Sequence, residues 1–176
     1  MNLDTFQRHA DKVVMANPAQ LVNTIHSLFH TYEDKFILTP NYHVFEMYMP
    51  HAGATAVRTE FIAPKASFTR LDAQRKESPA SFWGLNGSAS VKDKQLVVTV
   101  VNPHHNQARE TEISIRGAAI KSGESRTLTS TDIHARNSFA NPHALEPKTA
   151  PVNASGSTVT FQFPPASVTR LSLTLS

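Results

Sequence analysis

Alternating apolar and polar residues predict β-strands through most of the chain after residue 53. The run 95–102 holds five Val or Leu residues in eight positions and lies between two polar turns. Such a run suits a strand that is covered on both faces. In the next run, 110–116, Thr111, Ile113 and Ile115 point one way and the polar residues point the other. We therefore predict a buried central strand and a half-exposed strand flanking it in an antiparallel sheet.

Further strands are expected on the same grounds. They fall at 57–61, 125–130, 158–163 and 171–175, and a turn is predicted at Asn86-Gly87. The polar segments 64–79 and 132–151 are expected to be loops. Six or seven short strands separated by turn signals predict a mainly β fold, with an antiparallel β-sandwich over residues 53–176.

Residues 1–52 follow a helical pattern instead. A first helix is indicated around Leu3 and Phe6, followed by a short apolar run at 13–15. Asn17-Pro18 predicts the start of a second helix, with Gln20 at its third position. Thr39-Pro40 predicts the start of a third helix, which Pro50 ends. The apolar sides of these two helices are expected to be Leu21, Ile25, Leu28 and Phe29, and then Tyr42, Phe45 and Met49.

Composition narrows the function classes. The 176 residues carry a net charge of +3 without a Lys/Arg cluster, so no nucleic-acid binding is expected. No run approaches the roughly 18 apolar residues of a membrane span, and none resembles a signal peptide. The chain has no cysteine, which suits a reducing, cytoplasmic compartment.

Several motifs in order along the chain resemble one enzyme family. The segments are 8–23, with Ala16-Asn17-Pro18-Ala19-Gln20, and 38–48, with Thr39-Pro40-Asn41-Tyr42-His43. They continue with Val101-Asn102-Pro103-His104-His105, Asp132-Ile133-His134, Asn137-Ser138-Phe139 and Pro164-Pro165-Ala166. This order resembles the C-terminal portion of the glycoside hydrolase family 51 α-L-arabinofuranosidases.

The resemblance implies an architecture. In that family a (β/α)₈ barrel precedes a β-sandwich of jelly-roll type. Residues 1–52 would then be the remnant of the last βα units of a TIM barrel, with 13–15 as its eighth strand and 40–49 as its eighth helix. Residues 53–176 would be the C-terminal β-sandwich. Because a barrel needs about 250 residues, about seven βα units would lie before Met1; whether Met1 is a true start is left open.

The resemblance also implies a reaction and its missing parts. The family hydrolyses terminal non-reducing α-L-arabinofuranosyl residues of arabinose-containing oligosaccharides with retention, which requires two carboxyl groups. Its acid/base Glu follows an Asn at the end of the fourth strand, and its nucleophile ends the seventh strand. No Asn-Glu pair occurs in this chain, and acids such as Glu110, Glu112, Asp34 and Asp93 lie in strands or turns expected to be solvated. We expect no catalytic residue, cofactor or metal in the chain.

Gln20 is the single candidate site residue. The resemblance places it just after the eighth strand, where it would hydrogen-bond the arabinose ring. The residues alone favour a different role, in which Gln20 closes a capping box with Asn17.

Other candidate residues have simpler interpretations. His26 and His30 would be one turn apart on the second helix, but no third ligand is evident, so packing or surface roles are expected for the histidines. Trp83, beside Phe82, could stack on a sugar, although a place in the core is expected. The rival hypothesis is therefore a non-catalytic carbohydrate-binding β-sandwich. The family's assemblies and the apolar faces of residues 1–52 also predict a homo-oligomer.

Overall fold

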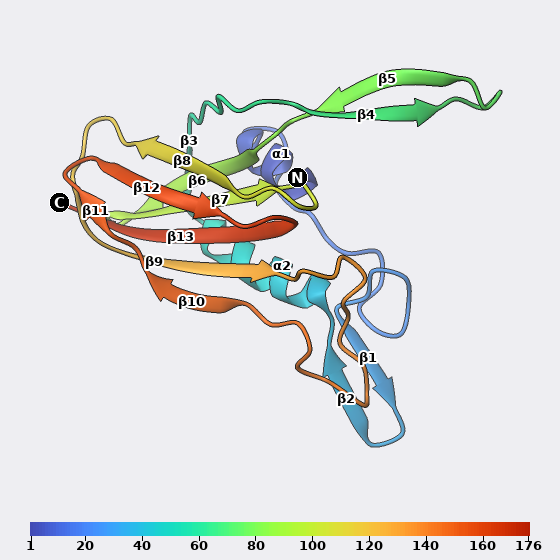
Figure 1. The fold of residues 1–176 in the computed structure, drawn as a ribbon. Helices are drawn as coiled ribbons and strands as arrows, with labels where there is room; N and C mark the ends of the chain where they lie inside the picture. The colour runs from blue at the N-terminus through green and yellow to red at the C-terminus, as the bar shows by residue number, and fades with distance from the viewer.

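Two antiparallel sheets share one hydrophobic core. The computed structural model describes residues 1–176, and in Figure 1 the smaller sheet lies in front of part of the larger one. The larger sheet has the order β10-β9-β13-β7-β6-β3 and the smaller has the order β11-β12-β8. The larger sheet consists of β3 (Thr55–Val57), β6 (Asn86–Lys92), β7 (Gln95–Asn102), β9 (Ile120–Thr129), β10 (Lys148–Pro151) and β13 (Ser167–Leu175). The smaller consists of β8 (Arg109–Ser114), β11 (Ala154–Ser155) and β12 (Thr158–Phe163).

The core forms where the inner faces of the two sheets meet. Val98 and Val100 come from β7, Leu171 and Leu173 from β13, and Phe163 from β12, and all belong to one buried cluster. Alternation explains this arrangement because residues two apart on a strand share a face. The mainly β prediction is confirmed, as are the positions of the strands at 95–102 and 158–163.

The predicted pairing of the two central strands is wrong. β7 lies between β13 and β6, whereas β8 pairs with β12 in the other sheet. Asn102, buried at the end of β7, directs the connection away from the larger sheet. Its side-chain amide donates to the carbonyl oxygens of Gln107, Phe163 and Pro164 at 2.8, 3.1 and 2.9 Å. Pairing partners far apart in sequence cannot be read from alternation alone.

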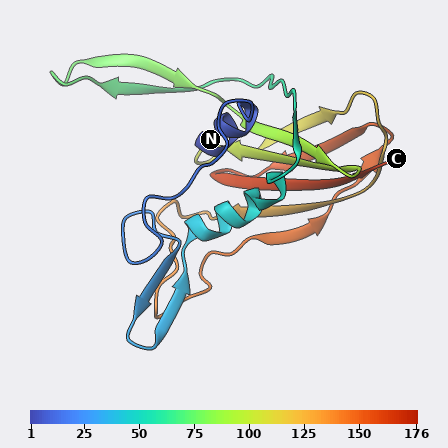
Figure 2. The ribbon, with the colours of Figure 1, turned by 180° about the vertical axis from the view of Figure 1, so that it is seen from behind.

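Two further expectations fail between residues 64 and 92. The predicted turn at Asn86-Gly87 is the buried start of β6. The predicted loop 64–79 instead includes most of a hairpin arm, formed by β4 (Ala66–Leu71) and β5 (Glu77–Phe82). The Asp72 carboxylate accepts hydrogen bonds from the backbone of Gln74 and Lys76 at 2.9 and 2.8 Å, and so closes the loop between the strands. Figures 1 and 2 show this arm standing clear of the two sheets.

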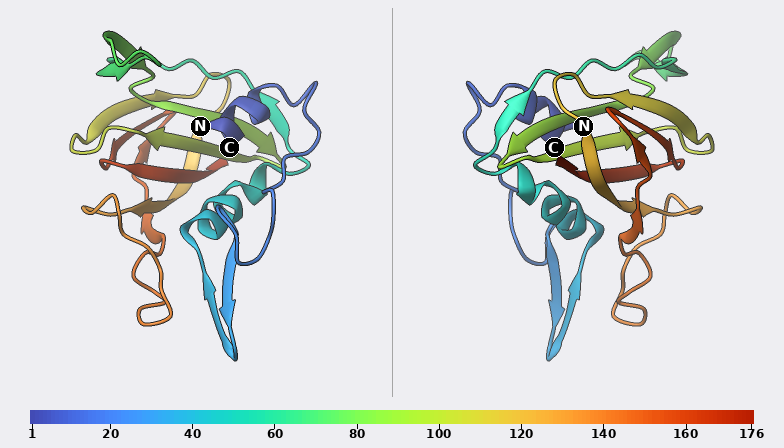
Figure 3. Two further views of the ribbon diagram at one scale, coloured as in Figure 1. Left: turned by 90° about the vertical axis from the view of Figure 1, so that its right-hand side faces the viewer. Right: turned by 90° about the vertical axis from the view of Figure 1, so that its left-hand side faces the viewer.

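The N-terminal helices cover the outer face of the larger sheet. α1 (Asn2–Arg8) contacts β6, while α2 (Pro40–Tyr48) contacts β9 and β13 and leads into η1 (Met49–His51). Figure 3 shows both helices on one side of the larger sheet. α2 begins as predicted, because Thr39 accepts from the backbone N–H of Tyr42 at 3.4 Å. Its buried residues are His43 and Met47, however, and the predicted apolar residue Met49 is exposed.

The predicted helix from Asn17 to Phe29 does not form. Asn23 and His26 have φ of 54° and 64°, which no right-handed helix accommodates. The side chain of Asn23 accepts from the backbone of Thr31 at 2.8 Å and holds the segment as a loop. This loop leads into a hairpin of β1 (Phe29–Tyr32) and β2 (Lys35–Leu38).

The predicted strand at 13–15 is also absent. The segment has no strand partner, and Val14 is 95% exposed. A strand requires a neighbour to receive its backbone hydrogen bonds, and none lies beside this segment.

No helix is both long and apolar enough to cross a membrane.

Candidate functional site

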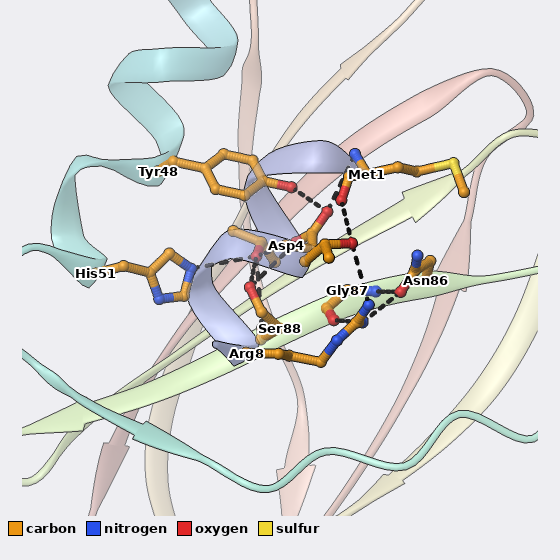
Figure 4. A network of polar contacts seen from close by, with 10 residues as sticks. Met1, Asp4, Arg8, Tyr48, His51, Asn86, Gly87 and Ser88 are labelled. Carbon is orange, nitrogen blue, oxygen red and sulfur yellow. Dashed lines mark hydrogen bonds and ion pairs between the residues drawn. The ribbon is translucent and has the colours of Figure 1, made fainter. Parts of the chain in front are cut away.

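A buried polar cluster joins α1 to the outer face of the larger sheet (Figure 4). We call it the Asp4 cluster; it comprises Asp4, Tyr48, His51, Ser88, Ser90 and Thr99. On β6 and β7 the core-facing residues Ala89 and Val98 alternate with these small polar residues, so the outer face of the sheet is polar here. Of these residues Asp4, His51, Ser88, Ser90 and Thr99 are buried.

The fully buried Asp4 carboxylate is surrounded by hydroxyl donors. Tyr48 donates to Oδ2 at 2.7 Å, and Thr99 and Ser88 donate to Oδ1 at 2.8 and 3.1 Å. The amino group of Met1 lies 3.2 Å from Oδ2. A buried carboxylate is costly unless it is hydrogen-bonded, and these contacts supply the missing solvation.

His51 contacts the cluster through both ring nitrogens. Nδ1 lies 2.7 Å from the Ser90 hydroxyl and Nε2 lies 3.2 Å from the Thr99 hydroxyl. The Thr99 proton is committed to Asp4, so the Thr99 oxygen accepts from Nε2–H and Ser90 donates to Nδ1. Burial lowers the pKa of His51 to about 4, opposed by the charge of Asp4 and aided by that of Arg170. His51 is therefore neutral at pH 7.

The environment also fixes the protonation of Tyr48. Burial, followed by the charge of Asp4 and the hydrogen bond to it, raises the pKa of Tyr48 well above the usual value of a tyrosine hydroxyl. The group thus stays protonated and continues to donate to Asp4.

Arg8 ends α1 over the start of β6. One guanidinium nitrogen lies 2.5 Å from the side-chain oxygen of Asn86 and 2.6 Å from the carbonyl oxygen of Gly87. A side chain at Gly87 would meet the Thr99 carbonyl oxygen at 2.0 Å, so only glycine fits beside the cluster. Arg8 thus ties the end of α1 to the start of β6, and Gly87 leaves room for the Thr99 carbonyl and the Phe61 ring.

The Asp4 cluster lacks the geometry of a nucleophilic site. Thr99 stands between Asp4 and His51, so no carboxylate orients the imidazole as in a Ser-His-Asp triad. Ser90 and Thr99 have no exposed surface, so a substrate cannot reach them. The cluster is a structural joint between the N-terminal segment and the sheet.

A second polar contact holds α2 on the same face. Glu46 and Arg126 form a bidentate pair at 2.7 and 2.8 Å, the geometry that gives an ion pair its strength. Beside it, burial and then the charge of Arg126 lower the pKa of Arg170. Nδ1 of the buried His43 lies 3.8 Å from the Glu46 carboxylate, and neither ring nitrogen makes a hydrogen bond.

Gln20 lies away from both polar contacts. It is exposed in the loop that follows residue 13. Because the predicted helix does not form there, the capping box of Gln20 with Asn17 is wrong. The structure brings no other candidate residue to Gln20.

The remaining sequence candidates are distributed over the surface. Glu110, Glu112, Asp34 and Asp93 are exposed, as predicted for solvated acids. His26 and His30 are not on a helix, so their predicted i, i+4 geometry is wrong. His104 and His105 stack with their ring centroids 5.4 Å apart. No group of three or more His, Asp or Glu side chains is placed to hold a metal ion.

Trp83 lies outside the core, so the predicted core position is wrong. It follows β5 at the base of the arm and is 61% exposed. The core expectation failed because the arm leaves the body of the molecule just before residue 84.

The surface hollows are small. One of about 270 Å³ lies where β7, β9 and β13 approach the loop 130–135, and another of about 200 Å³ lies beside Pro50 and Val97. Each contains a single acid, Asp132 or Asp93. Neither therefore holds the carboxyl pair that glycoside hydrolysis uses.

The Asp4 cluster was not predicted from the sequence. A usable signal was present, because Thr99 interrupts the apolar run 95–102, and Ser88 and Ser90 alternate with Ala89 and Val91. Their partner Asp4 lies more than 80 residues away in the sequence, however, and no local pattern relates the two.

Comparison with known proteins matches nearly all of the chain to one family. A family model described as the alpha-L-arabinofuranosidase C-terminal domain matches residues 1–167. The chain is 28% identical over 176 residues to a protein of Bacteroides ovatus named intracellular exo-alpha-L-arabinofuranosidase, covering 98% of this chain and 32% of that one.

Solved structures agree with this match. The GH51 arabinofuranosidase from Xanthomonas axonopodis pv. citri superposes with a TM-score of 0.84 at 30% identity, covering 98% of this chain and 34% of that one. The alpha-L-arabinofuranosidase from Thermotoga maritima, in an arabinose complex, gives a TM-score of 0.83 at 29% identity, covering 98% and 36%. The chain thus spans about a third of the length of these relatives.

Proposed function

Because the chain belongs to the family of α-L-arabinofuranosidase C-terminal domains, we propose that it is the C-terminal part of a retaining α-L-arabinofuranosidase. The observation that carries this proposal is the uneven coverage, in which nearly all of this chain corresponds to about a third of each relative. The whole enzyme would release terminal non-reducing α-L-arabinofuranosyl residues from arabinose-containing oligosaccharides. It would act in the cytoplasm, in keeping with the name of the Bacteroides ovatus relative.

The chain would contribute two parts to that enzyme. Residues 1–52 would complete a (β/α)₈ barrel, with 13–15 as its last strand and α2 as its last helix. Two observations support this assignment: residues 13–15 lack a strand partner, and Val14 and Met15 are exposed. Residues 53–176 would form the accessory jelly-roll sandwich, tied to the barrel through the Asp4 cluster and the Glu46–Arg126 pair.

Gln20 would bind substrate in the whole enzyme. It follows the proposed last strand, and active sites of such barrels lie at the carboxyl ends of the strands. An exposed amide without a partner in the chain is available to hydrogen-bond a sugar hydroxyl.

A chimera tests this proposal directly. The C-terminal third of the Bacteroides ovatus relative would be replaced by residues 1–176, and hydrolysis of p-nitrophenyl α-L-arabinofuranoside would be measured. We expect activity in the chimera and a loss of roughly tenfold to a hundredfold in kcat/KM for Gln20→Ala, since one lost hydrogen bond to substrate is worth about 1.4–2.7 kcal/mol. Gln7→Ala, which replaces a glutamine on α1, is the matched control. A folded but inactive chimera would contradict the assignment.

The exposed Trp83 favours a second candidate function, a carbohydrate-binding module. Aromatic rings present a flat apolar face to sugars, and Trp83 is the single tryptophan of the chain. Its fluorescence therefore reports on this site alone. Saturable quenching by arabino-oligosaccharides, absent in Trp83→Ala, would support this second function; an unchanged spectrum at millimolar sugar would exclude it.

A further inference from the structure

The arm formed by β4 and β5 has two edges that differ chemically. β4 and β5 pair only with each other. The backbone N–H of Asp72 donates to Lys76 at 3.1 Å, so this opposed pair is hydrogen-bonded. Hydrogen-bonded and non-hydrogen-bonded pairs alternate along an antiparallel ladder. Positions 66, 68 and 70 therefore bond to β5, and positions 67, 69 and 71 turn their backbone groups outward.

The outer edge of β5 is blocked and that of β4 is open. Pro79 faces Thr69 in the ladder and has no N–H to offer on its outward side. Proline on an outer edge is a common protection against pairing with another strand. On β4 the outward positions are Ser67, Thr69 and Leu71, and each has both a free N–H and a free C=O.

Several large apolar side chains of the arm are exposed to solvent. Phe68 is 45% exposed although it packs edge-on against Phe82 at 5.5 Å, and Leu71 is 60% exposed. An isolated two-stranded hairpin is at best marginally stable in water. An arm with one open edge and an uncovered aromatic pair is thus suited to receive another strand.

We propose that β4 pairs with β4 of a second copy of this chain, making a four-stranded sheet around a two-fold axis at Thr69. Antiparallel self-pairing through a two-fold axis perpendicular to the sheet keeps each side chain on its own face. With Thr69 opposite Thr69 of the other copy, Ser67 lies opposite Leu71, and every outward backbone group of β4 is paired.

The same register matches the side chains. Phe68 of each copy faces Arg70 of the other in a non-hydrogen-bonded pair, where side chains are closest, and a guanidinium stacks favourably on an aromatic ring. A register shifted by one step, with Arg70 at the axis, would oppose two like charges. The arm carries four Lys or Arg against two Asp or Glu between residues 64 and 83, so the pairing should strengthen as salt screens the two arms.

This pairing is independent of the proposed hydrolase, because it uses only the arm. Sedimentation velocity of the 176-residue chain should show a concentration-dependent dimer that added salt strengthens. Thr69→Pro removes the donors at the axis while leaving the bonds to β5, and should raise the dissociation constant about tenfold. Ser81→Pro places the same change on the outer edge of β5 and should leave the dimer unchanged.

A cysteine pair tests the register even if proline disturbs the arm. The two Thr69 Cα atoms would be about 5.5 Å apart, within the range of a disulfide, and the chain has no other cysteine. Under mild oxidation Thr69→Cys should crosslink at least about tenfold faster than the matched variant Ser81→Cys. A chain that stays monomeric at several hundred micromolar overturns the proposal. So does equal crosslinking of the two variants, which would assign any dimer to another surface, such as the exposed segment 13–25.

Discussion

At the scale of single residues, Asp4 determines how the N-terminal segment is attached. Its carboxylate accepts hydrogen bonds from three hydroxyl groups, one at the end of α2, one on β6 and one on β7. One side chain thus links elements that are remote in sequence. Such a joint tolerates little change, because every donor in it would be left unpaired in a buried place.

Tyr48→Phe should destabilise the folded chain by about 1.5–3 kcal/mol, the usual worth of a hydrogen bond to a charged group. The ring is kept, so packing is unchanged. Tyr42→Phe is the matched control on the same helix, since no hydrogen bond of its hydroxyl is present. Urea unfolding of both variants measures the difference. Equal stabilities would mean that the Tyr48 hydroxyl adds nothing.

His51 gives the cluster a pH dependence. Its folded pKa of about 4 lies below the ordinary value of about 6.5. Between these values the unfolded chain binds the proton first, so stability falls as pH falls through this window and is fully present above it. The loss at pH 5.5 is about 1.4 kcal/mol.

This pH effect should disappear in His51→Gln and persist in His134→Gln, which changes an exposed histidine. Urea unfolding between pH 4.5 and 7.5 tests it. If the wild-type chain and His51→Gln lose stability equally on acidification, another group is responsible.

At the scale of elements, segments form regular secondary structure where a neighbouring segment pairs with them. β7 and β13 pair along eight positions and carry the core, whereas residues 14–22 donate no backbone hydrogen bond to another backbone group. Local stability should follow the same division, because segments with few buried contacts open most easily.

Limited proteolysis should therefore cut the segment 14–22 before the sheet strands. Thermolysin suits this test, since Val14, Met15 and Leu21 are exposed apolar residues. Mass spectrometry of the first fragments locates the cut. A first cut within 86–102 would show that the N-terminal segment is the better protected part.

At the scale of the whole molecule, the chain corresponds to about a third of the length of the family members that it matches. Its buried carboxylate serves a structural joint, and its other acids lie apart on strands and turns. The family's activity requires two carboxyl groups about 5 Å apart in retaining enzymes.

The purified chain should thus not hydrolyse p-nitrophenyl α-L-arabinofuranoside above a buffer blank, and an intact family enzyme serves as the positive control. Turnover that persists through repeated purification and disappears in Asp4→Asn would reverse this view and give the Asp4 cluster a catalytic role.

Local sequence pattern was sufficient to predict the strands that alternate regularly and the start of α2. The runs 95–102, 158–163 and 171–175 alternate with the period of a strand, and Thr39-Pro40 supplies a cap and a fixed φ. These signals are local, so they can be recognised without knowing which distant residues pack against them. Each family motif is weak by itself, and the motifs became informative because they occur in the same order as in the family.

Three features depend on contacts between distant residues: which strands pair, where the first 28 residues lie, and how the arm extends from the two sheets. The Asn17-Pro18 start and its apolar face were sufficient to predict a helix, yet helices gain most of their stability from packing, and Leu21 and Ile25 of this face stay exposed. Asn86-Gly87 has turn chemistry, but Arg8 and the pairing with Val100 and Val101 of β7 hold it in a strand. Contacts between residues far apart in sequence outweigh local preference in both places, and such contacts leave no local pattern to recognise.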